Sequence, residues 1–294
     1  MAGFRTIVIN KRCKLDSLLG SMVIRSVKEE RVHISEIETL IIESTAVALT
    51  AALVTDLSEA GANIIFCDRK HLPSSVFTPV HAHYSAAKNI REQIAWSEEL
   101  KAQCWKLVVK EKIRQQALHL AHHGKKSEHN LLMAYRKEVL DGDSDNREAH
   151  AAAAYFRTLF GANFSRNNSD SVNNALNYGY TLLTATFARE ISACGYIPEL
   201  GIFHRGMENA FNLASDLMEP FRPAVDRLAM MLPEEEESHK RSILRVLNSQ
   251  LEINGGNQSF IPAVRIYLHR IFRFMRGEVE DIFTLGIPVS AAEI

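Results

Sequence analysis

One stretch of the sequence, FHRGMENAFNLASDLMEPFRPAVD, carries ionisable side chains at spacings that suit metal chemistry. His204 precedes Asp216 and Glu219 by twelve and fifteen residues, and the two acids are three residues apart. Side chains at positions i and i+3 share one side of a helical turn, so both carboxylates are expected to point the same way. Two prolines follow at once and leave the helix start open, because proline is favoured only in a first turn.

A third acid, Glu148, lies in the segment DNREAHAAAAYFRTLFG, where Asp145 or Asn146 can cap a helix. The alanines at 149 and 151–154 would let another helix approach closely and leave Glu148 facing a crevice. Each acid also has a simpler explanation, since carboxylates in a first turn complement the helix dipole. A loop histidine such as His204 is often only a surface or capping group.

Taken together, two or three carboxylates and one imidazole form an oxygen-rich ligand set that suits Mg²⁺ or Mn²⁺. Such a centre can polarise a phosphoryl oxygen and lower the pKa of a bound hydroxyl. The chemistry indicated is therefore phosphoryl transfer, although residue spacing alone does not bring Glu148 to the other two side chains.

The elements that must position these residues change character along the chain. Residues 4–80 show short β-branched runs, which predict a small, mainly antiparallel β domain. The segment STAVALTAALVTDLSEAGA interrupts them with one helix, capped by Ser44 or Thr45 and ended by Gly61.

From residue 81 onward the apolar period is about 3.6, which predicts a larger all-α domain. A long helix is expected from Ser85 to His123, and Gly124 closes it. Further helices are expected near 127–140, 147–160, 170–194, 215–232, 238–250 and 259–275. The fold class is thus α+β with two domains, 1–80 and 81–294.

Composition excludes few function classes but indicates the cellular compartment. The 294 residues carry 34 basic and 35 acidic side chains, so net charge does not advertise a nucleic acid partner, which would need basic groups sorted onto one face. The four cysteines are scattered, and neither a signal peptide nor a membrane span is evident, which predicts a soluble cytoplasmic protein with reduced thiols.

Several polar patterns remain open between structure and function. The stripe Asn173, Asn177, Thr181 and Thr184 could form interhelical hydrogen bonds or a polar wall beside a site. Basic residues near 265–276 and on the long helix could follow DNA phosphates or simply extend from amphipathic helices, and Arg222 could contact a phosphate or order the site. The basic positions in question are Arg265, Arg270, Arg273, Arg276, Lys106, Lys110, Lys112, Arg114, Lys125 and Lys126.

Some histidines have zinc-like spacing but no convincing third ligand. They are His81 with His83, and His119 with His122 and His123. Surface or linker roles are the favoured interpretation. The single Glu236–His239 pair falls short of the two pairs that a di-iron bundle needs.

The blocks NREAHAAAAYF, NNALNYGYTLL, GIFH and FNLASDLMEPFRPAVD, in this order and at these distances, resemble the CRISPR-associated integrase of spacer acquisition, the Cas-one family. The last block and the length resemble most the form found beside the type II effector nuclease. The resemblance covers essentially the whole chain. It implies a β-rich dimerisation domain and a helical catalytic domain, with Glu148, His204 and Glu219 as ligands of Mg²⁺ or Mn²⁺ and Asp216 as an auxiliary acid.

The reaction implied by the resemblance is attack of the 3′-hydroxyl of a short double-stranded DNA fragment on a phosphodiester at a CRISPR repeat border. The implied assembly is a homodimer, with two such dimers bridged by a small Cas-two dimer. The type II effector nuclease and a ring-forming accessory protein are further expected partners. The alternative is a non-catalytic scaffold that holds DNA ends and whose acids are purely structural.

Overall fold

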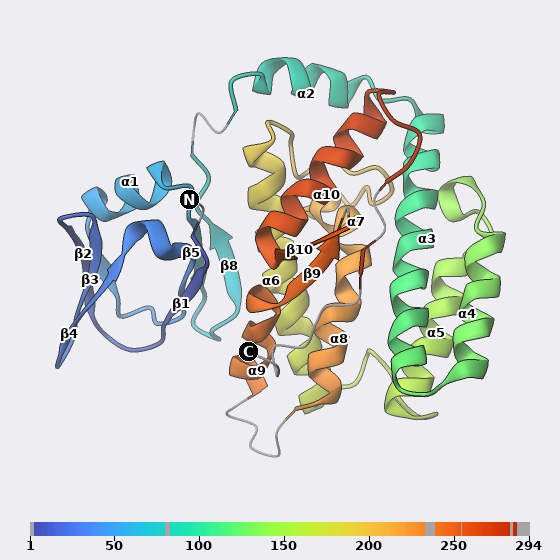
Figure 1. The fold of residues 1–294 in the computed structure, drawn as a ribbon, viewed down its shortest axis with the longest axis horizontal. Helices are drawn as coiled ribbons and strands as arrows, with labels where there is room; N and C mark the ends of the chain where they lie inside the picture. The colour runs from blue at the N-terminus through green and yellow to red at the C-terminus, as the bar shows by residue number, and fades with distance from the viewer. Residues whose placement is uncertain (1–2, 80–82, 233–238, 254, 283–284, 287–294) are drawn as a thin grey trace. The chain divides into compact units, whose positions relative to one another are not determined.

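A computed structural model describes residues 3–79, 83–232, 239–253, 255–282 and 285–286. The chain divides into two compact units, Met1–Ala82 and His83–Ile294 (Figure 1). The division falls two residues from the boundary that the change of apolar period predicts. Each unit has its own hydrophobic core and is described by itself.

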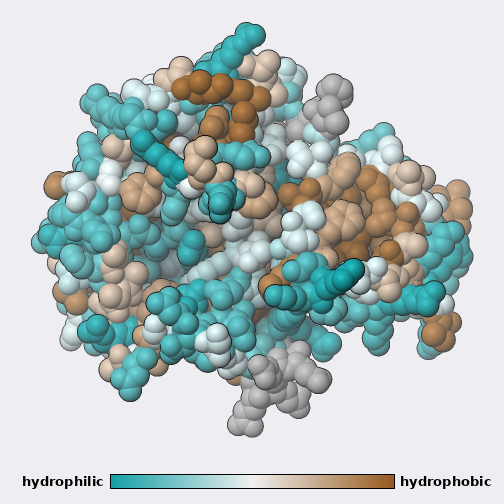
Figure 2. Space-filling model, turned by 180° about the vertical axis from the view of Figure 1, so that it is seen from behind, coloured by the Kyte–Doolittle hydropathy of each residue, from teal (hydrophilic) through white to brown (hydrophobic). Residues whose placement is uncertain are grey.

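The N-terminal unit contains two four-stranded sheets. The first has the order β1-β5-β7-β8, built from Arg5–Ile9, Ile37–Ile42, Asn63–Cys67 and Pro73–Val76. The second has the order β4-β3-β2-β6, built from Glu29–His33, Ser21–Arg25, Lys14–Leu18 and Ala48–Leu49. Figure 2 shows apolar side chains gathered on one face of this unit.

The expectation of a mainly antiparallel unit is wrong for the first sheet. Strands β1 and β7 both run parallel to β5, and only β8 is antiparallel to its neighbour. Strand β5, with the sequence IETLII, is buried at all six positions, as strands of parallel sheets covered on both faces usually are. The sequence signal for this parallel strand was a run of mostly apolar residues that does not alternate with polar ones.

Helix α1, Ala51–Glu59, is the α-helix expected in this unit, but it begins later than predicted. Its cap is Thr50, whose hydroxyl accepts a hydrogen bond from the Leu53 amide, rather than Ser44 or Thr45. Residues 48–49, just before the helix, form the short strand β6, which pairs with β2. This pairing takes them out of the helix that the apolar period predicts. Gly61, at φ +74°, follows the helix as predicted.

The long helix expected over 85–123 is two helices, α2 (Ala86–Ile94) and α3 (Glu98–His122). The break lies at Ser97, which is extended and whose hydroxyl accepts from the Leu100 amide at 3.1 Å. A capping serine outweighs the continuous apolar period here. Gly124, at φ +73°, follows the end of α3.

The remaining helices follow the sequence prediction closely, with two exceptions. They are α4 (Lys126–Glu138), α5 (Arg147–Phe160), α6 (Ser171–Ala193), α7 (Asn212–Leu217), α8 (Arg222–Met230), α9 (His239–Leu244) and α10 (Phe260–Met275). The expected helix 215–232 is split by the 3-10 turn Glu219–Phe221, where Pro220 lies. The expected helix 238–250 ends early and is followed by a hairpin.

That hairpin makes the all-α description of the C-terminal unit wrong. Strands β9 (Gln250–Ile253) and β10 (Gly256–Ser259) pair antiparallel, and Gly255 between them has φ +74°. Asn-Gly and Gly-Gly steps are typical of tight hairpin turns, which explains the strand reversal. The unit is therefore mainly helical with one small sheet.

Helices α3 and α6 are central to this unit. Helix α6 contacts α7, α8, α9 and α10, while α3 contacts α4, α5, α8 and α10. Gly179 lets α6 approach its neighbours, because a Cβ there would lie 2.3 Å from a Val225 methyl carbon. Within the described part of the chain, no helix is both long and apolar enough to cross a bilayer.

Candidate metal centre

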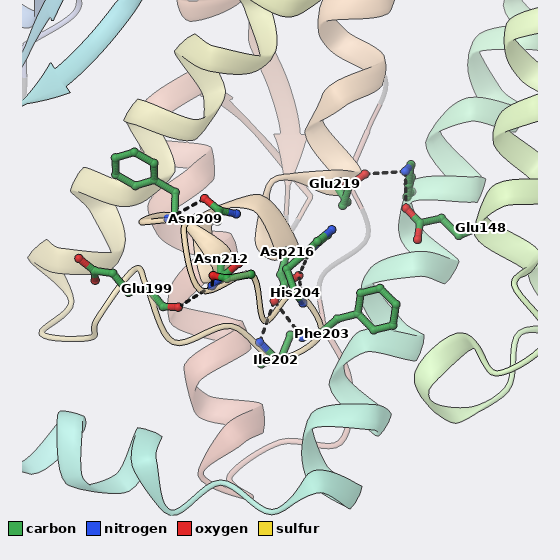
Figure 3. Close-up of polar contacts among 12 residues, drawn as sticks. Glu148, Glu199, Ile202, Phe203, His204, Asn209, Asn212, Asp216 and Glu219 are labelled. Carbon is green, nitrogen blue, oxygen red and sulfur yellow. Dashed lines mark hydrogen bonds and ion pairs between the residues drawn. The ribbon is translucent and has the colours of Figure 1, made fainter. Parts of the chain in front are cut away.

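His204 lies in the loop that follows α6, and a buried acid fixes its position. Its Nδ1 atom lies 2.5 Å from Oδ1 of Asp216, which is fully buried at the start of the stretch that leads to Glu219 (Figure 3). This contact engages Nδ1 and leaves Nε2 as the ring nitrogen that can bind a metal. Metal-binding histidines commonly have such a carboxylate on the other nitrogen.

Asp216 also organises the backbone of the loop. Its Oδ2 accepts hydrogen bonds from the amides of Ile202 and Phe203 at 2.7 and 3.0 Å, and its Oδ1 accepts one from the His204 amide at 3.1 Å. Gly201 is required by the same arrangement, since a Cβ there would lie 2.3 Å from the His204 carbonyl oxygen. Asp216 is therefore an anchor for the histidine loop.

Aromatic packing holds the other side of the loop. Phe203 stacks on Trp105 of α3 with ring centroids 4.4 Å apart and an angle of 4° between the ring planes. His204 meets the edge of the same indole at 6.0 Å. Trp105 is fully buried, so α3 supplies a rigid wall against which the imidazole is placed.

Glu219 begins the 3-10 turn after α7 and is 3% exposed. Its Oε1 forms an ion pair with Nη2 of Arg222 at 2.9 Å. The Arg222 guanidinium also lies over the ring of Tyr180, 4.6 Å from its centroid. Of the two roles considered for Arg222, the geometry favours ordering of the site, because the guanidinium is already held by an acid and a ring.

Glu148 lies in the first turn of α5, as the sequence predicts. The cap differs from the prediction, because Asn146 adopts a left-handed conformation with φ 56° and makes no side-chain cap bond. Instead, the Asp143 carboxylate accepts from the amides of Arg147 and Glu148 at 2.9 and 3.0 Å. This cap fixes the direction in which the Glu148 side chain leaves the helix.

Lys112 of α3 joins the two glutamates. Its Nζ lies 2.5 Å from Oε1 of Glu148 and 2.5 Å from Oε2 of Glu219. Figure 3 labels the two glutamates. Because both oxygens contact one nitrogen, they lie no more than twice that distance apart. Lys112 is one of the basic residues that the sequence leaves open as DNA contacts, but it is only 8% exposed and faces the site.

The electrostatics agree with one shared site. Burial alone would lower the pKa of Lys112, but the charges of Glu219 and Glu148 outweigh it and the pKa is raised. Burial would raise the pKa of Glu219, yet the charges of Arg222 and Lys112 hold it below its usual value. The hydrogen bond to Asp216 raises the pKa of His204, and the charges of both glutamates add to the effect. The imidazole therefore lies within electrostatic reach of both acids.

Among the described residues, no three His, Cys, Asp or Glu side chains lie together at metal-binding spacing. The glutamates are brought together through Lys112, and His204 is nearby but not in contact with them. Glu219 Oε2 is buried, and the Lys112 ammonium is the cation that pairs with it. Two carboxylates and an available imidazole nitrogen are a donor set that fits Mg²⁺ or Mn²⁺.

A cleft of about 610 Å³ opens beside His204. Trp96, Lys101 and Arg205 contribute to its lining, together with the glycine-rich loop around Gly206. Helix α2 supports the cleft through Gln93, whose amide nitrogen donates to the carbonyls of Ile197 and Leu200 at 2.9 and 3.0 Å. The histidine is thus reachable from outside, with its side chain 43% exposed.

The sequence prediction missed a third buried acid, Asp226. Tyr180 donates to its Oδ1 at 2.5 Å, and burial raises the pKa of Asp226 to about 6. Charges on Arg222 and Lys112 act on it from the site. Its position seven residues after Glu219, about two helical turns on, was the available signal in the sequence.

The uncharged stripe of α6 serves local structure. Arg166 donates to the side-chain oxygens of Asn173 and Asn177, with 2.7 Å to the latter. Thr181 and Thr184 donate to carbonyl oxygens one turn back. Thr184 also donates to the Met218 sulfur at the end of α7 at 3.3 Å, so the interhelical interpretation holds for this residue, while the rest of the stripe binds a loop arginine and its own helix.

The basic strip of α10 is largely compensated by acids. Arg265 pairs with the buried Glu190 at 2.7 Å. Arg270 pairs with Asp281, and both Arg273 and Arg276 pair with Glu278. These contacts favour the structural interpretation of the strip.

The zinc-like histidines do not form a centre among the residues that the structure describes. His119 is buried, with Nδ1 2.6 Å from the Tyr155 hydroxyl, and burial lowers its pKa to about 3. His83 lines a small pocket of about 290 Å³ with His269 and Arg276. His81 and Glu236 lie outside the described residues.

A family model and a curated relative both match most of this chain. The family of CRISPR associated protein Cas1 matches residues 7–250. The CRISPR-associated endonuclease Cas1 of Neisseria meningitidis serogroup C (strain 8013) is 35% identical over 269 residues, which cover 89% of this chain and 88% of that protein.

Solved structures share the fold. A casposase bound to its integration product has a TM-score of 0.75 at 17% identity and covers 94% of this chain and 92% of its own. A Cas6-RT-Cas1–Cas2 complex has a TM-score of 0.68 at 16% identity and covers 93% of this chain and 35% of its own.

Proposed function

The chain belongs to the Cas1 family of CRISPR-associated proteins, and on that basis we propose that it is a metal-dependent DNA integrase and endonuclease. It inserts short double-stranded DNA fragments into a CRISPR array. The observation that carries the proposal is the pair of glutamates from separate helical segments that meet at Lys112 beside a histidine held by Asp216. Family membership supports the nuclease activity, since relatives are named endonucleases.

The chemistry balances without an external energy source. The 3′-hydroxyl oxygen of the fragment attacks a phosphorus of the repeat, one P–O bond forms, and the bond to the repeat's own 3′ oxygen breaks. The proton of the attacking hydroxyl leaves, and the departing oxygen takes one up. A bound Mg²⁺ or Mn²⁺ would polarise the phosphoryl oxygen and stabilise the charge that develops.

The residues of this chain have separate parts in that reaction. Glu148, Glu219 and Nε2 of His204 would hold the cation. Asp216 orients the imidazole and fixes its protonated nitrogen, so that Nε2 carries the free electron pair. Arg222 holds one oxygen of Glu219 and leaves the other for the cation.

The proposed partners are DNA fragments, repeat DNA and a small Cas2 dimer that bridges two Cas1 dimers. A fold neighbour solved as a complex with Cas2, and another bound to an integration product, support the Cas2 and DNA partners. Dimerisation is assigned to the N-terminal unit, residues 1–80 of the sequence prediction, and catalysis to residues 81–294. The type II effector nuclease and the ring-forming accessory protein complete the proposed set, and the cytoplasm is the proposed location.

A strand-transfer assay tests the proposal. The full chain, with Cas2, is given a labelled fragment and a repeat-containing plasmid, with Mn²⁺ or with EDTA. Joined product should form only with the metal, and Glu148→Gln and His204→Ala should abolish it while DNA binding persists. Glu138→Gln is the control glutamate, because its side chain is 52% exposed and pairs with Arg147 rather than with Lys112.

The scaffold alternative gives a different result. A protein whose acids are purely structural would bind DNA equally with and without EDTA and form no joined product under any condition. That outcome would replace the integrase proposal. Circular dichroism of each variant separates loss of chemistry from loss of fold.

A further inference from the structure

We propose that Lys112 is a built-in counter-ion that stands in for the metal when the metal is absent and competes with it for Glu219 and Glu148. The inference rests on the proposed function, because it takes these glutamates to be metal ligands. It assigns to Lys112 a positioning role: the ammonium keeps the two carboxylates together and sets how much free metal is needed to occupy the centre.

The Lys112 ammonium lies between the two glutamates. Lys112 comes from α3, Glu148 from α5 and Glu219 from the turn after α7, so one nitrogen ties together three segments far apart in sequence. Both contacts are 2.5 Å, and the lysine side chain is 10% exposed. A lysine this buried persists only with acidic partners, because an unpaired buried charge is costly.

The charges around the site limit how many cations it can hold. Glu148 and Glu219 supply two negative charges, and Lys112 and Arg222 supply two positive ones. The carboxylate of Asp216 on the third ligand, His204, adds one negative charge, so a divalent cation would leave one excess positive charge in a buried place. The least costly adjustment is for one cationic side chain to withdraw.

The contacts indicate which side chain withdraws. Arg222 binds Glu219 Oε1 and is held further by the ring of Tyr180. Lys112 binds the other oxygen, Oε2, and shares its single ammonium group with Glu148. It is also the cation that lies between the two glutamates, where a shared metal would bind. Lysine, with its flexible stem, can leave more readily than a stacked guanidinium.

The test is a Mn²⁺ titration of the full chain, followed by the electron paramagnetic resonance signal of free Mn²⁺. Lys112→Met keeps much of the side-chain volume but removes the charge, so Mn²⁺ affinity should rise at least tenfold. Thermal unfolding without metal should occur at a lower temperature in this variant, and saturating Mn²⁺ should raise it by more than in the wild type.

Lys106→Met is the matched control, because Lys106 lies on the same helix and pairs with a single acid, Asp141, at 2.8 Å. Its Mn²⁺ affinity should equal that of the wild type. Lys112→Arg keeps the charge and should not tighten Mn²⁺ binding. Equal Mn²⁺ affinity in folded Lys112→Met and the wild type, or weaker affinity in the variant, would overturn the inference.

A second measurement on the wild type serves if Lys112→Met does not fold. Acylation of lysines, read by mass spectrometry, should modify Lys112 slowly without Mn²⁺ and several-fold faster with it, while Lys106 reacts at one rate throughout. An unchanged rate at Lys112 with Mn²⁺ demonstrably bound would refute displacement. Absence of any Mn²⁺ binding by the wild type would instead remove the metal from the proposed function, and the inference with it.

Discussion

Asp216→Asn should damage this protein in two measurable ways, because one carboxylate organises both a loop and a histidine. The substitution is nearly isosteric, but it replaces an oxygen that accepts hydrogen bonds with an amide nitrogen that donates them. Each Asp216 oxygen contacts two nitrogen atoms of residues 202–204. Asparagine can keep only one of these two pairs.

The expected loss of stability follows from those contacts. Two hydrogen bonds to a buried charged group disappear, and the donors on that side face an amide that also donates. At about 1.5–3 kcal/mol for each bond to a charged group, the free energy of unfolding should fall by roughly 4 kcal/mol. For a unit of this size, that corresponds to a midpoint about 10 °C lower.

The second effect concerns the metal. With Asp216 replaced, the His204 ring loses the acceptor that fixes Nδ1, so Mn²⁺ affinity should weaken about tenfold and high Mn²⁺ should partly restore strand transfer. His204→Ala separates the two effects. That side chain is 43% exposed and makes only one of the four contacts to Asp216, so the variant should lose metal affinity while its free energy of unfolding falls by about 1.5–3 kcal/mol, less than in Asp216→Asn.

Thermal unfolding by circular dichroism and a Mn²⁺ titration on the same samples provide both readings. Asp141→Asn is the control, since this acid is 50% exposed and pairs with Lys106 rather than with the histidine loop. A midpoint within 2 °C of the wild type for Asp216→Asn would show that the loop does not depend on its four contacts. An unchanged Mn²⁺ titration would show that the imidazole does not need its carboxylate.

Three further outcomes are expected. Gly201→Ala places a methyl group 2.3 Å from the His204 carbonyl oxygen, so it should lower the thermal unfolding midpoint by several degrees and reduce strand transfer. A wild-type midpoint together with wild-type strand transfer would contradict the close approach. The pKa of His119 is about 3 in the folded protein against 6.5 in the unfolded chain, so the unfolded chain binds the extra proton as the pH falls. The free energy of unfolding should therefore fall by up to about 4 kcal/mol between pH 6.5 and pH 3. Denaturant unfolding of His119→Gln should depend less on pH than that of the wild type. Replacing the arginines of α10 by glutamine should change the slope of log DNA affinity against log salt by less than about one, because acids already compensate them, and a change near three would make the strip a phosphate track. The three positions are Arg270, Arg273 and Arg276.

The helices of the C-terminal unit were predictable because their signals are local. Helix α5 begins and ends where the alanine-rich pattern predicts, and α6 lies within one residue of its predicted limits. The missed break between α2 and α3 was also local, since Ser97 is a capping residue that the apolar period obscured. Parallel pairing of β5 with β1 was less accessible, because it depends on strands 28 or more residues apart.

The site was predictable in its acids and histidine through the family resemblance, but not in how they are held. Asp216 was considered either a helix-capping acid or an acid near the metal, whereas it binds three backbone amides that no spacing rule connects to it. Lys112 resembled its neighbours on α3 in sequence. Only the packing of α3 against α5 and the turn after α7 distinguishes a buried counter-ion from a surface lysine.

The anchoring of His204 by Asp216 constrains how the sequence can change over time. Residues 202–204 of this loop are held by Asp216 and by the stacking of Phe203 on Trp105, whereas residues 207–210, further along, are mostly exposed. Insertions and deletions in that exposed part would leave the imidazole in place. A single insertion between Asp216 and Glu219 would rotate one carboxylate by about a quarter turn relative to the other and separate the histidine from its partner acids. Length variation in descendants of this protein should therefore collect in the loop and spare the turn.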